Sequence, residues 1–393
     1  MRRGIFFLVL QKTIVTTSQE LLSRLATPAI VLDRQRLLSN CARMAERARS
    51  AGVRLRPHLK TAKCAEVARL ATSGQSGGIT VSTLAELNYF FEAGFRDLTY
   101  AVGIVAAKMD AIESLIRRGA QVRILLDSVQ AVADLAARGS ALEVPVLIEI
   151  DCGGRRAGVA ADGDALLAIA RHIEEAPGLV LDGVLTHAGQ AYHAASAAVR
   201  SEIARAERDA AVCAARRLRD AGYACHTVSI GSTPTALTDI PLTGVTEIRP
   251  GVYMFMDLAQ AGLGVCRPED IAVSVLATVI GHHREAGHLL VDAGALALSK
   301  DTSAGEFAPA TGFGAVCDID GRPVPGLHVA DVHQEHGFVR SSGGPVPFDR
   351  FPVGSRVRIL PNHACMTVAP YPQYEVIDTD AGTLSHWTKT YGW

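Results

Sequence analysis

The chain has 393 residues, 48% of them hydrophobic and 20% charged, which is enough to build two domains with large cores. The 39 lysines and arginines balance the 40 aspartates and glutamates, so the composition excludes a broadly basic surface for nucleic acid. Aromatic residues make up only 5% of the chain, which also argues against base stacking. No run of about 18 apolar residues occurs, so we expect no membrane partner.

The eight cysteines are scattered, and none forms a Cys-x-x-Cys pair. This pattern argues against a disulfide framework and against a four-cysteine zinc site, and it favours a reducing, cytoplasmic location. The apolar run Ile5–Leu10 is too short for an export signal. We expect this run to be a strand, within an N-terminal segment (residues 1–24) that joins the C-terminal domain.

From about Thr27, short apolar strands alternate with amphipathic helices. The predicted strands are Ala29–Leu32, Val53–Leu55, Gly78–Val81, Leu98–Ala101, Val122–Leu126, Val144–Ile150, Leu179–Leu185, Thr227–Ile230 and Thr246–Ile248. The predicted helices are Arg34–Ala51, Ala65–Ala71, Leu84–Ala93, Ala107–Arg118, Ser128–Arg138, Gly163–Ala176 and Ala194–Gly222. About eight βα repeats in roughly 240 residues predict an α/β fold with a TIM-like (β/α)8 barrel over residues 25–266. In such a barrel the active site lies where the strands end and the loops begin.

After about Cys266 the pattern changes to strands separated by Gly, Pro and Asp, with little helical periodicity. The predicted strands are Ile271–Ile280, His288–Val291, Gly326–Val329, Gly337–Arg340, Arg356–Ile359 and Tyr374–Thr379. We therefore expect a second, all-β domain over residues 267–393.

The segment Arg56–Lys63 follows the predicted strand Val53–Leu55 and contains His58 and Lys60. A lysine at the mouth of a barrel can be desolvated, and a desolvated amine is nucleophilic enough to form a Schiff base. An ordinary surface loop is the alternative, because lysine and arginine are mostly solvated. We take Lys60 and His58 as the candidate catalytic residues.

Two segments after the last predicted barrel strands can hold a phosphate. Gly231–Thr235 offers small residues, backbone N–H groups and hydroxyls. In the next segment Gly251 allows close approach of the backbone, and Tyr253 offers a hydroxyl. A plain turn and a buried tyrosine are the alternatives. The candidate residues are Gly231, Ser232, Thr233, Gly251 and Tyr253.

Three further side chains follow barrel strands. Arg156 comes after Val144–Ile150, where it could present a cation to a cofactor or pair with Asp151 instead. His187 and Tyr192 come after Leu179–Leu185, and we expect them to face the same pocket.

His363 and Cys365 follow the predicted strand Arg356–Ile359. On an extended segment the two side chains would share a face, because a strand has a period of two residues. Imidazole and thiolate favour zinc, and two protein ligands leave positions for water and substrate. A buried cysteine beside a hydrogen-bonded histidine is the alternative, and His333 or His336 could supply a third ligand.

The order of these segments along the chain resembles that of the fold-type III pyridoxal-phosphate enzymes, which have an alanine-racemase-like barrel. Among these enzymes, the chain most resembles the family of D-threonine aldolases and eukaryotic-type D-serine dehydratases. The segments that carry the resemblance are Arg56–Thr61, Glu149–Asp151 with Arg156, Thr186–Gly189, Gly231–Thr235, Arg249–Tyr253, Val291–Gly294, Glu335–Gly337 and Pro361–Cys365. The resemblance implies that Lys60 holds pyridoxal 5'-phosphate, that Arg156 lies near its phenolic oxygen, and that the Gly231 and Gly251 segments hold its phosphate. It also implies a divalent metal on His363 and Cys365, for which zinc is favoured and Mn²⁺ or Mg²⁺ are alternatives.

Within this family, aldolases tend to read His-Cys-Asp and dehydratases His-x-Cys, and this chain reads His363-Ala364-Cys365. We therefore expect a lyase that converts a β-hydroxy D-amino acid, such as D-serine or D-threo-3-hydroxyaspartate, to a 2-oxo acid and ammonia. A D-threonine-type aldolase is the alternative, and an amino-acid racemase or a non-catalytic cofactor carrier is less favoured. Because the lysine and the metal pair fall in different domains, we expect a homodimer with shared active sites.

Overall fold

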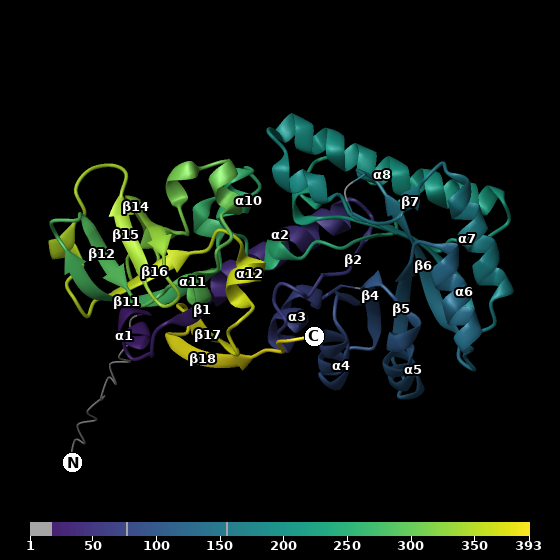
Figure 1. Ribbon diagram of the computed structural model, residues 1–393, viewed down its shortest axis with the longest axis horizontal. Helices are drawn as coiled ribbons and strands as arrows, with labels where there is room; N and C mark the ends of the chain where they lie inside the picture. The colour runs from purple at the N-terminus through teal and green to yellow at the C-terminus, as the bar shows by residue number, and fades with distance from the viewer. Residues whose placement is uncertain (1–17, 76–77, 155) are drawn as a thin grey trace, which may run out of the picture.

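The computed structural model describes residues 18–75, 78–154 and 156–393, which fold into two lobes (Figure 1). The strand predicted at residues 5–10 lies outside the described residues. The described part of the predicted N-terminal segment begins with a short helix, α1 (Ser18–Ser23).

One lobe is a barrel of parallel strands, in the order β2-β10-β9-β8-β6-β5-β4-β3 across the described residues. These strands are β2 (Arg54–Leu55), β3 (Ile79–Val81), β4 (Asp97–Gly103), β5 (Gln121–Leu126), β6 (Val144–Asp151), β8 (Leu179–Thr186), β9 (Thr227–Ile230) and β10 (Glu247–Ile248), with the short β7 (Val159–Ala160) beside β6. The circle closes just beyond β2, where His58 forms a parallel bridge to Thr80 in β3. The predicted TIM-like (β/α)8 architecture is confirmed.

Helices connect the barrel strands and cover the barrel (Figure 1). They are α2 (Arg34–Ser50), α3 (Ala65–Thr72), α4 (Leu84–Glu92), α5 (Met109–Arg117), α6 (Val129–Arg138), α7 (Asp164–Glu175), α8 (Ala197–Asp220) and α9 (Thr233–Ala236). Hydroxyl side chains cap the N-termini of several of these helices and determine where they begin. In α8, the Ser196 side chain accepts a hydrogen bond from the Val199 N–H, so the helix starts three residues later than predicted. No helix in the described ranges is long and apolar enough to span a membrane.

The other lobe is a mainly antiparallel sheet in the order β12-β15-β14-β13-β16-β11-β1-β17-β18. Its C-terminal strands are β11 (Val273–His283), β12 (His288–Val291), β13 (Ala315–Cys317), β14 (Pro323–Val332), β15 (Gly337–Ser341), β16 (Arg356–Leu360), β17 (Gln373–Asp378) and β18 (Thr383–Thr388). Three short helices are inserted before and between them: α10 (Leu258–Gly262), α11 (Ala295–Leu298) and α12 (Ala364–Val368). A further pairing of β12 with β11 closes part of the sheet into a small barrel. The predicted C-terminal β architecture is confirmed.

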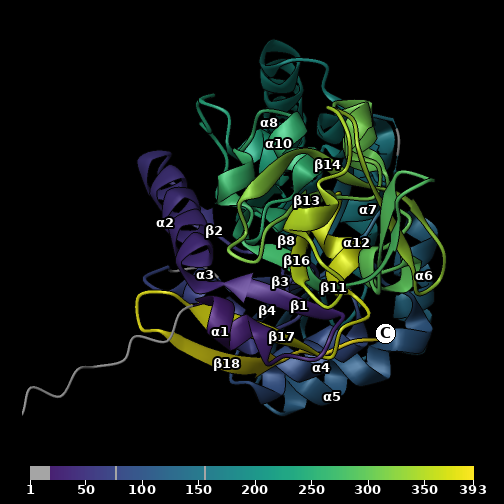
Figure 2. The same cartoon turned by 90° about the vertical axis from the view of Figure 1, so that its left-hand side faces the viewer.

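The strand β1 (Ala29–Asp33) is not part of the TIM-like barrel, where its sequence pattern had placed it. It pairs antiparallel with β11 and parallel with β17, so it lies inside the C-terminal sheet. Figure 2 shows β1 beside β17, with β18 at the outer edge. A short apolar run fits any strand buried on both faces, and its composition does not specify its partners. From β1 in the C-terminal lobe, the chain crosses to the barrel through α2. The predicted domain limits at residues 25 and 266 remain predictions.

Candidate active site

A cavity of about 680 Å³ lies where the barrel loops meet the C-terminal lobe. This volume is typical of a site for a small molecule. Most of the residues singled out in the sequence line it, from both lobes. They are His58, Lys60, Arg156, His187, Tyr192, Gly231, Ser232, Gly251, His363 and Cys365.

Lys60 lies directly after the point of barrel closure. The Thr80 N–H donates to the Pro57 carbonyl over 2.9 Å, and the Leu59 N–H donates to the Thr80 carbonyl over 2.8 Å, so the backbone on both sides of His58 is fixed. The next residue, Thr61, has its Oγ1 3.0 Å from the Cys365 Sγ. The lysine and the metal pair therefore meet within one chain, and their separation in sequence does not by itself require a second subunit.

Two histidines in the cavity are held neutral by their surroundings. Burial lowers the pKa of His58 well below its ordinary value, and the nearby cations Lys60 and Arg249 lower it further. Burial also lowers the pKa of His187, to about 3. The His187 Nδ1 lies 3.0 Å from the Gly231 carbonyl oxygen, so the proton sits on Nδ1 and Nε2 is left as an acceptor. The cavity thus combines neutral imidazoles with fixed cations, an environment that favours an anionic ligand.

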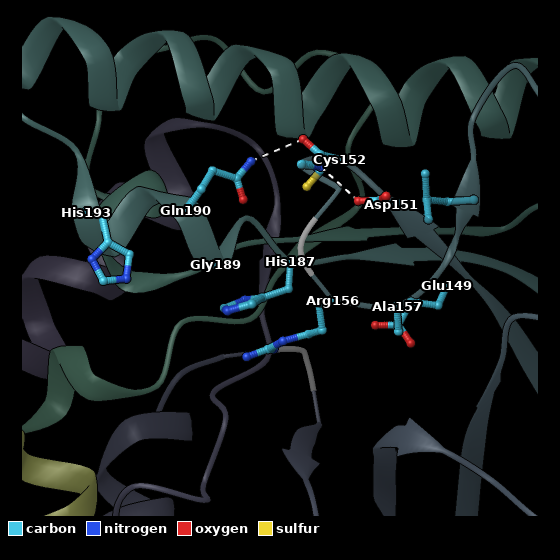
Figure 3. A pocket seen from close by; sticks show the side chains of 11 residues that line it. Glu149, Asp151, Cys152, Arg156, Ala157, His187, Gly189, Gln190 and His193 are labelled. Atoms are coloured by element: carbon cyan, nitrogen blue, oxygen red, sulfur yellow. Dashed lines mark hydrogen bonds between the residues drawn. The ribbon is translucent and has the colours of Figure 1, made fainter.

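Arg156 stands at the border between the cavity and a side pocket of about 220 Å³ (Figure 3). The Asp151 carboxylate accepts hydrogen bonds from the Gly153 and Gly154 N–H groups, at 2.9 and 2.7 Å, instead of pairing with the arginine. No ion pair to Arg156 occurs within the described residues. Figure 3 shows its side chain extending in the same direction as that of His187. The arginine is therefore free to bind an anion in the cavity.

The loop 152–158 that carries Arg156 is anchored from a neighbouring loop. The Gln190 amide donates to the Cys152 carbonyl over 3.1 Å, as Figure 3 shows. A Cβ on Gly153 would lie 2.5 Å from the Gln190 side chain, so a larger residue there would displace the Gln190 amide from its present position. Gln190 belongs to the short helix η2 (Gly189–His193), and it therefore holds the arginine loop against the His187 loop.

The Gly231 segment is a capped helix start rather than an open loop. Gly231 has φ of +119°, a value that favours glycine, and the Ser232 side chain accepts a hydrogen bond from the Thr235 N–H. The Thr233 N–H lies against the Tyr192 hydroxyl. Burial raises the pKa of that hydroxyl above its ordinary value, so it stays protonated. Gly231 and Ser232 thus present small and hydroxylic groups to the cavity.

Two of the predicted phosphate residues do not line the cavity. The Thr233 Oγ1 instead accepts a hydrogen bond from the Tyr253 N–H at 3.1 Å. The Tyr253 side chain is completely buried, and its hydroxyl has no hydrogen-bond partner among the described residues. Burial raises the pKa of that hydroxyl well above its ordinary value, so the hydroxyl stays protonated. The backbone of Tyr253 therefore meets the Gly231 segment through Thr233, and a phosphate contact of its hydroxyl remains a prediction.

His363 and Cys365 lie together, but the prediction that they share an extended segment is wrong. His363 caps α12, and Cys365 is in that helix's first turn. The chain turns here because the buried Asp257 carboxylate accepts a hydrogen bond from the Ala364 N–H over 2.9 Å. The His363 Nδ1 is 2.7 Å from the Asp301 Oδ2, which leaves Nε2 available to a ligand.

The electrostatics of His363 match a cation site. Burial alone would lower its pKa, but Cys365, Asp257 and Asp301 outweigh burial and raise it to about 10. His333 and His336 are exposed in the turn between β14 and β15 and do not line the cavity. Across residues 18–75, 78–154 and 156–393, no group of three or more His, Cys, Asp or Glu side chains is arranged to hold a metal ion. Within this chain a metal would therefore have His363 and Cys365 as its two candidate ligands.

Four charged side chains in the cavity were not named as site residues from the sequence. They are Glu149, Arg249, Asp257 and Asp301. Arg249 directly follows β10, a position that could have pointed to it. It is buried, donates to the Ser229 Oγ over 2.7 Å, and has its pKa lowered to about 10 by burial. Asp257 and Asp301 had no such signal, because only folding brings them beside His363.

Residues 32–259 match the family described as the alanine racemase N-terminal domain, and residues 272–377 match the putative serine dehydratase domain. The chain is 45% identical to the D-threo-3-hydroxyaspartate dehydratase of Delftia sp. strain HT23, covering 95% of this chain and 100% of that protein. A solved structure of that enzyme has a TM-score of 0.90 and covers 95% of this chain and 99% of its own.

Two other relatives span most of the chain. The D-serine dehydratase of Dictyostelium discoideum is 32% identical, over 95% of this chain and 98% of that protein. The D-threonine aldolase of an Arthrobacter species is 30% identical, over 87% of this chain and 86% of that protein. The alanine racemase N-terminal domain has the fold of the pyridoxal-phosphate-dependent fold-type III enzymes. This chain therefore belongs to the alanine racemase N-terminal domain family, in the branch that carries a serine dehydratase domain after the barrel.

Proposed function

We propose that this protein is a pyridoxal-phosphate- and zinc-dependent lyase that dehydrates a β-hydroxy D-amino acid to a 2-oxo acid and ammonia. The observation that carries the proposal is the convergence of Lys60, Arg156 and the His363–Cys365 pair in one cavity at the mouth of the barrel. The similarity to the Delftia dehydratase supports D-threo-3-hydroxyaspartate as the first substrate to test, followed by D-serine.

The cavity fits pyridoxal phosphate. Its cations lower the pKa values of His58 and His187, and an anionic ligand would offset their charge. A Cβ on Gly251 would come within 2.9 Å of the His58 carbonyl oxygen, so the backbone is closely packed at this wall of the cavity. Lys60 would bind the cofactor covalently, Ser232 with the backbone of Gly231 and Gly251 would hold its phosphate, and Arg156 would bind a ring or phosphate oxygen.

The His363–Cys365 pair fits a soft divalent cation. Imidazole and thiolate are ligands that favour zinc, whereas magnesium and calcium prefer oxygen ligands. Asp301 on the Nδ1 of His363 supplies the carboxylate partner that commonly orients a metal-binding histidine. A cysteine-to-alanine variant of the Delftia enzyme has been solved in a metal-free form, which supports a metal in that relative.

The chain's own groups divide the chemistry among them. When bound, pyridoxal phosphate withdraws electrons from the substrate's Cα and a metal polarises its β-hydroxyl. Lys60, as a free amine, would remove the Cα proton, and that proton and the β-hydroxyl group would together leave as water. The Arg156 and Arg249 guanidinium groups bind the substrate's and cofactor's anionic oxygens, and the neutral His187 offers Nε2 as an acceptor. Loss of water across Cα and Cβ gives an enamine, which water hydrolyses to a 2-oxo acid and ammonia.

The first test is cofactor attachment. Wild-type protein reconstituted with pyridoxal phosphate should show the absorption band of a lysine-bound cofactor, and Lys60→Ala should lose it. Lys63→Ala is a matched control, since Lys63 instead pairs with Glu86 at 3.2 Å, and this variant should keep the band. A wild-type protein without the band would refute the proposal.

The second test separates the possible reactions. D-threo-3-hydroxyaspartate, D-serine and D-threonine are supplied separately, and ammonia, 2-oxo acid, glycine and aldehyde are measured. Ammonia with 2-oxo acid supports the dehydratase. Glycine with an aldehyde would identify an aldolase. An L-amino acid without ammonia would identify a racemase, and no turnover of any substrate would identify a non-catalytic cofactor carrier.

The metal, the oligomeric state and the location have their own tests. Chelation should abolish ammonia release while the lysine-bound cofactor band persists, because the metal pair does not include Lys60. Metal analysis should find zinc, and less than about one-tenth equivalent of zinc with full activity would reject the zinc site.

We also propose that the protein is a homodimer, to be checked by sedimentation under assay conditions. We further propose a cytoplasmic location, which the eight free thiols support.

A further inference from the structure

The three residues after Lys60 are each held by the C-terminal lobe of the same chain. The Thr61 hydroxyl lies 3.0 Å from the Cys365 Sγ. The Tyr374 hydroxyl in β17 donates to the Ala62 carbonyl over 2.7 Å. The Thr390 N–H, just past β18, donates to the Lys63 carbonyl over 2.8 Å. The segment that carries the lysine is therefore tied to the lobe that carries the metal pair.

The contact of Thr61 with Cys365 differs from the other two, because it reaches a candidate metal ligand. Thr61 lines the cavity but is only 1% exposed, so its hydroxyl has little access to water. Among the described residues, Cys365 is its only hydrogen-bond partner. A Cβ on Gly251 would lie 3.4 Å from Oγ1, so this side of the threonine is closely packed and its hydroxyl is held beside the sulfur.

We propose that Thr61 is a positioning residue for the metal, donating its hydroxyl hydrogen to the Cys365 thiolate and so coupling the metal ligand to the Lys60 segment. This inference rests on the metal pair of the proposed function. When a metal binds, the S–H bond of Cys365 breaks, its proton leaves to solvent, and a metal–sulfur bond forms. A thiolate has no hydrogen to donate, so the Thr61 hydroxyl must then be the donor.

The donated hydrogen has two effects on the sulfur. It occupies one lone-pair direction, which leaves the others for the metal on the cavity side. It also restricts rotation of the Cys365 side chain, so the ligand is in position before the metal arrives. Partners of metal ligands typically change metal affinity by about 10- to 100-fold when they are removed. Since Thr61 follows Lys60 directly, the same hydrogen bond fixes the backbone next to the lysine.

The experiment compares three variants of the holoenzyme. Thr61→Val removes the hydroxyl at nearly constant volume, and Thr61→Ser retains a donor. Tyr374→Phe is the matched control, because it removes one hydrogen bond between the same segment and the same lobe without touching the sulfur. Zinc affinity is measured by competition with a chromophoric chelator, and the lysine-bound cofactor band shows that each variant is folded and loaded.

We expect Thr61→Val to bind zinc about 10-fold more weakly or worse, with Thr61→Ser and Tyr374→Phe within about threefold of wild type. Should Thr61→Val not fold, Thr61→Ala takes its place with the same expectation. Unchanged zinc affinity in Thr61→Val overturns the inference, and so does an equal loss in Thr61→Ser, since a packing role would then explain it. If the wild type binds no zinc, both this inference and the proposal that His363 and Cys365 bind a metal are wrong. The lyase proposal is tested separately, by measuring ammonia release from the substrate.

Discussion

Glu207 offers the sharpest test of how the barrel holds the loops that follow β8 and β9. This carboxylate on α8 is completely buried, and its Oε1 accepts hydrogen bonds from the Ala188 N–H at 2.7 Å and the Gly231 N–H at 3.2 Å. Ala188 follows His187, and Gly231 begins the proposed phosphate segment. One oxygen atom thus connects the ends of β8 and β9.

Glu207→Ala would leave both N–H groups buried without an acceptor. An unsatisfied buried donor costs about 1–3 kcal/mol, so two such groups should lower the free energy of unfolding by about 2–6 kcal/mol, before any cavity term. Glu207→Gln keeps one oxygen in place, and we expect a change of less than about 1 kcal/mol at pH 5.

The two variants also differ in their dependence on pH. Burial raises the pKa of Glu207 above its ordinary value of 4.5. The stability that this carboxyl contributes is therefore complete below pH 4.5 and is lost as the pH rises through the raised pKa. Glu207→Gln has no such group, so its stability relative to wild type should increase from pH 5 to pH 8.

Urea denaturation of the cofactor-free proteins, followed by circular dichroism at pH 5 and pH 8, measures both effects. The reasoning is refuted if Glu207→Ala stays within about 1 kcal/mol of wild type, or if Glu207→Gln is as unstable as Glu207→Ala at pH 8. Equilibrium dialysis with pyridoxal phosphate adds a functional readout, for which Glu207→Ala should bind more weakly than Glu207→Gln.

Three further predictions concern other charged side chains. Lys389 is 5% exposed, and burial lowers its pKa to about 8 from 10.5. The stability of Lys389→Met relative to wild type should therefore be about 3 kcal/mol greater below pH 8 than above pH 10.5, while the hydrogen bond from Lys389 to the Ala369 carbonyl is lost at every pH. Thermal melts across this range test it, and a relative stability that does not change with pH contradicts it. Asp301→Asn removes the carboxylate from His363 and should weaken zinc binding about 10-fold or more; chelator competition decides, and wild-type affinity would reject the role assigned to Asp301. Asp97→Ala removes one partner of the fully buried Arg56 and should cost about 3 kcal/mol in urea denaturation; a loss below about 1 kcal/mol would show that Glu247 alone satisfies the arginine.

Much of the fold could be predicted because its signals are local. The alternation of apolar strands with amphipathic helices depends on neighbouring residues, and it correctly indicated the barrel; the change in pattern correctly indicated a C-terminal β architecture. Strand β1 shows the limit of such signals. Its apolar residues specify a buried strand, but its partners β11 and β17 lie more than 200 residues away, and only packing selects them.

The site divides in the same way between sequence and tertiary structure. The short segments around Lys60, Gly231 and His363 could be singled out as candidates, because their residue types and their order along the chain resemble those of one enzyme family. The contacts between them could not, since Asp301 meets His363 across 62 residues and Thr61 meets Cys365 across 304. The sequence by itself determined which groups are candidates for the chemistry. Tertiary structure decided which of them share the cavity, because burial, charge and distance depend on where distant segments of the chain come together.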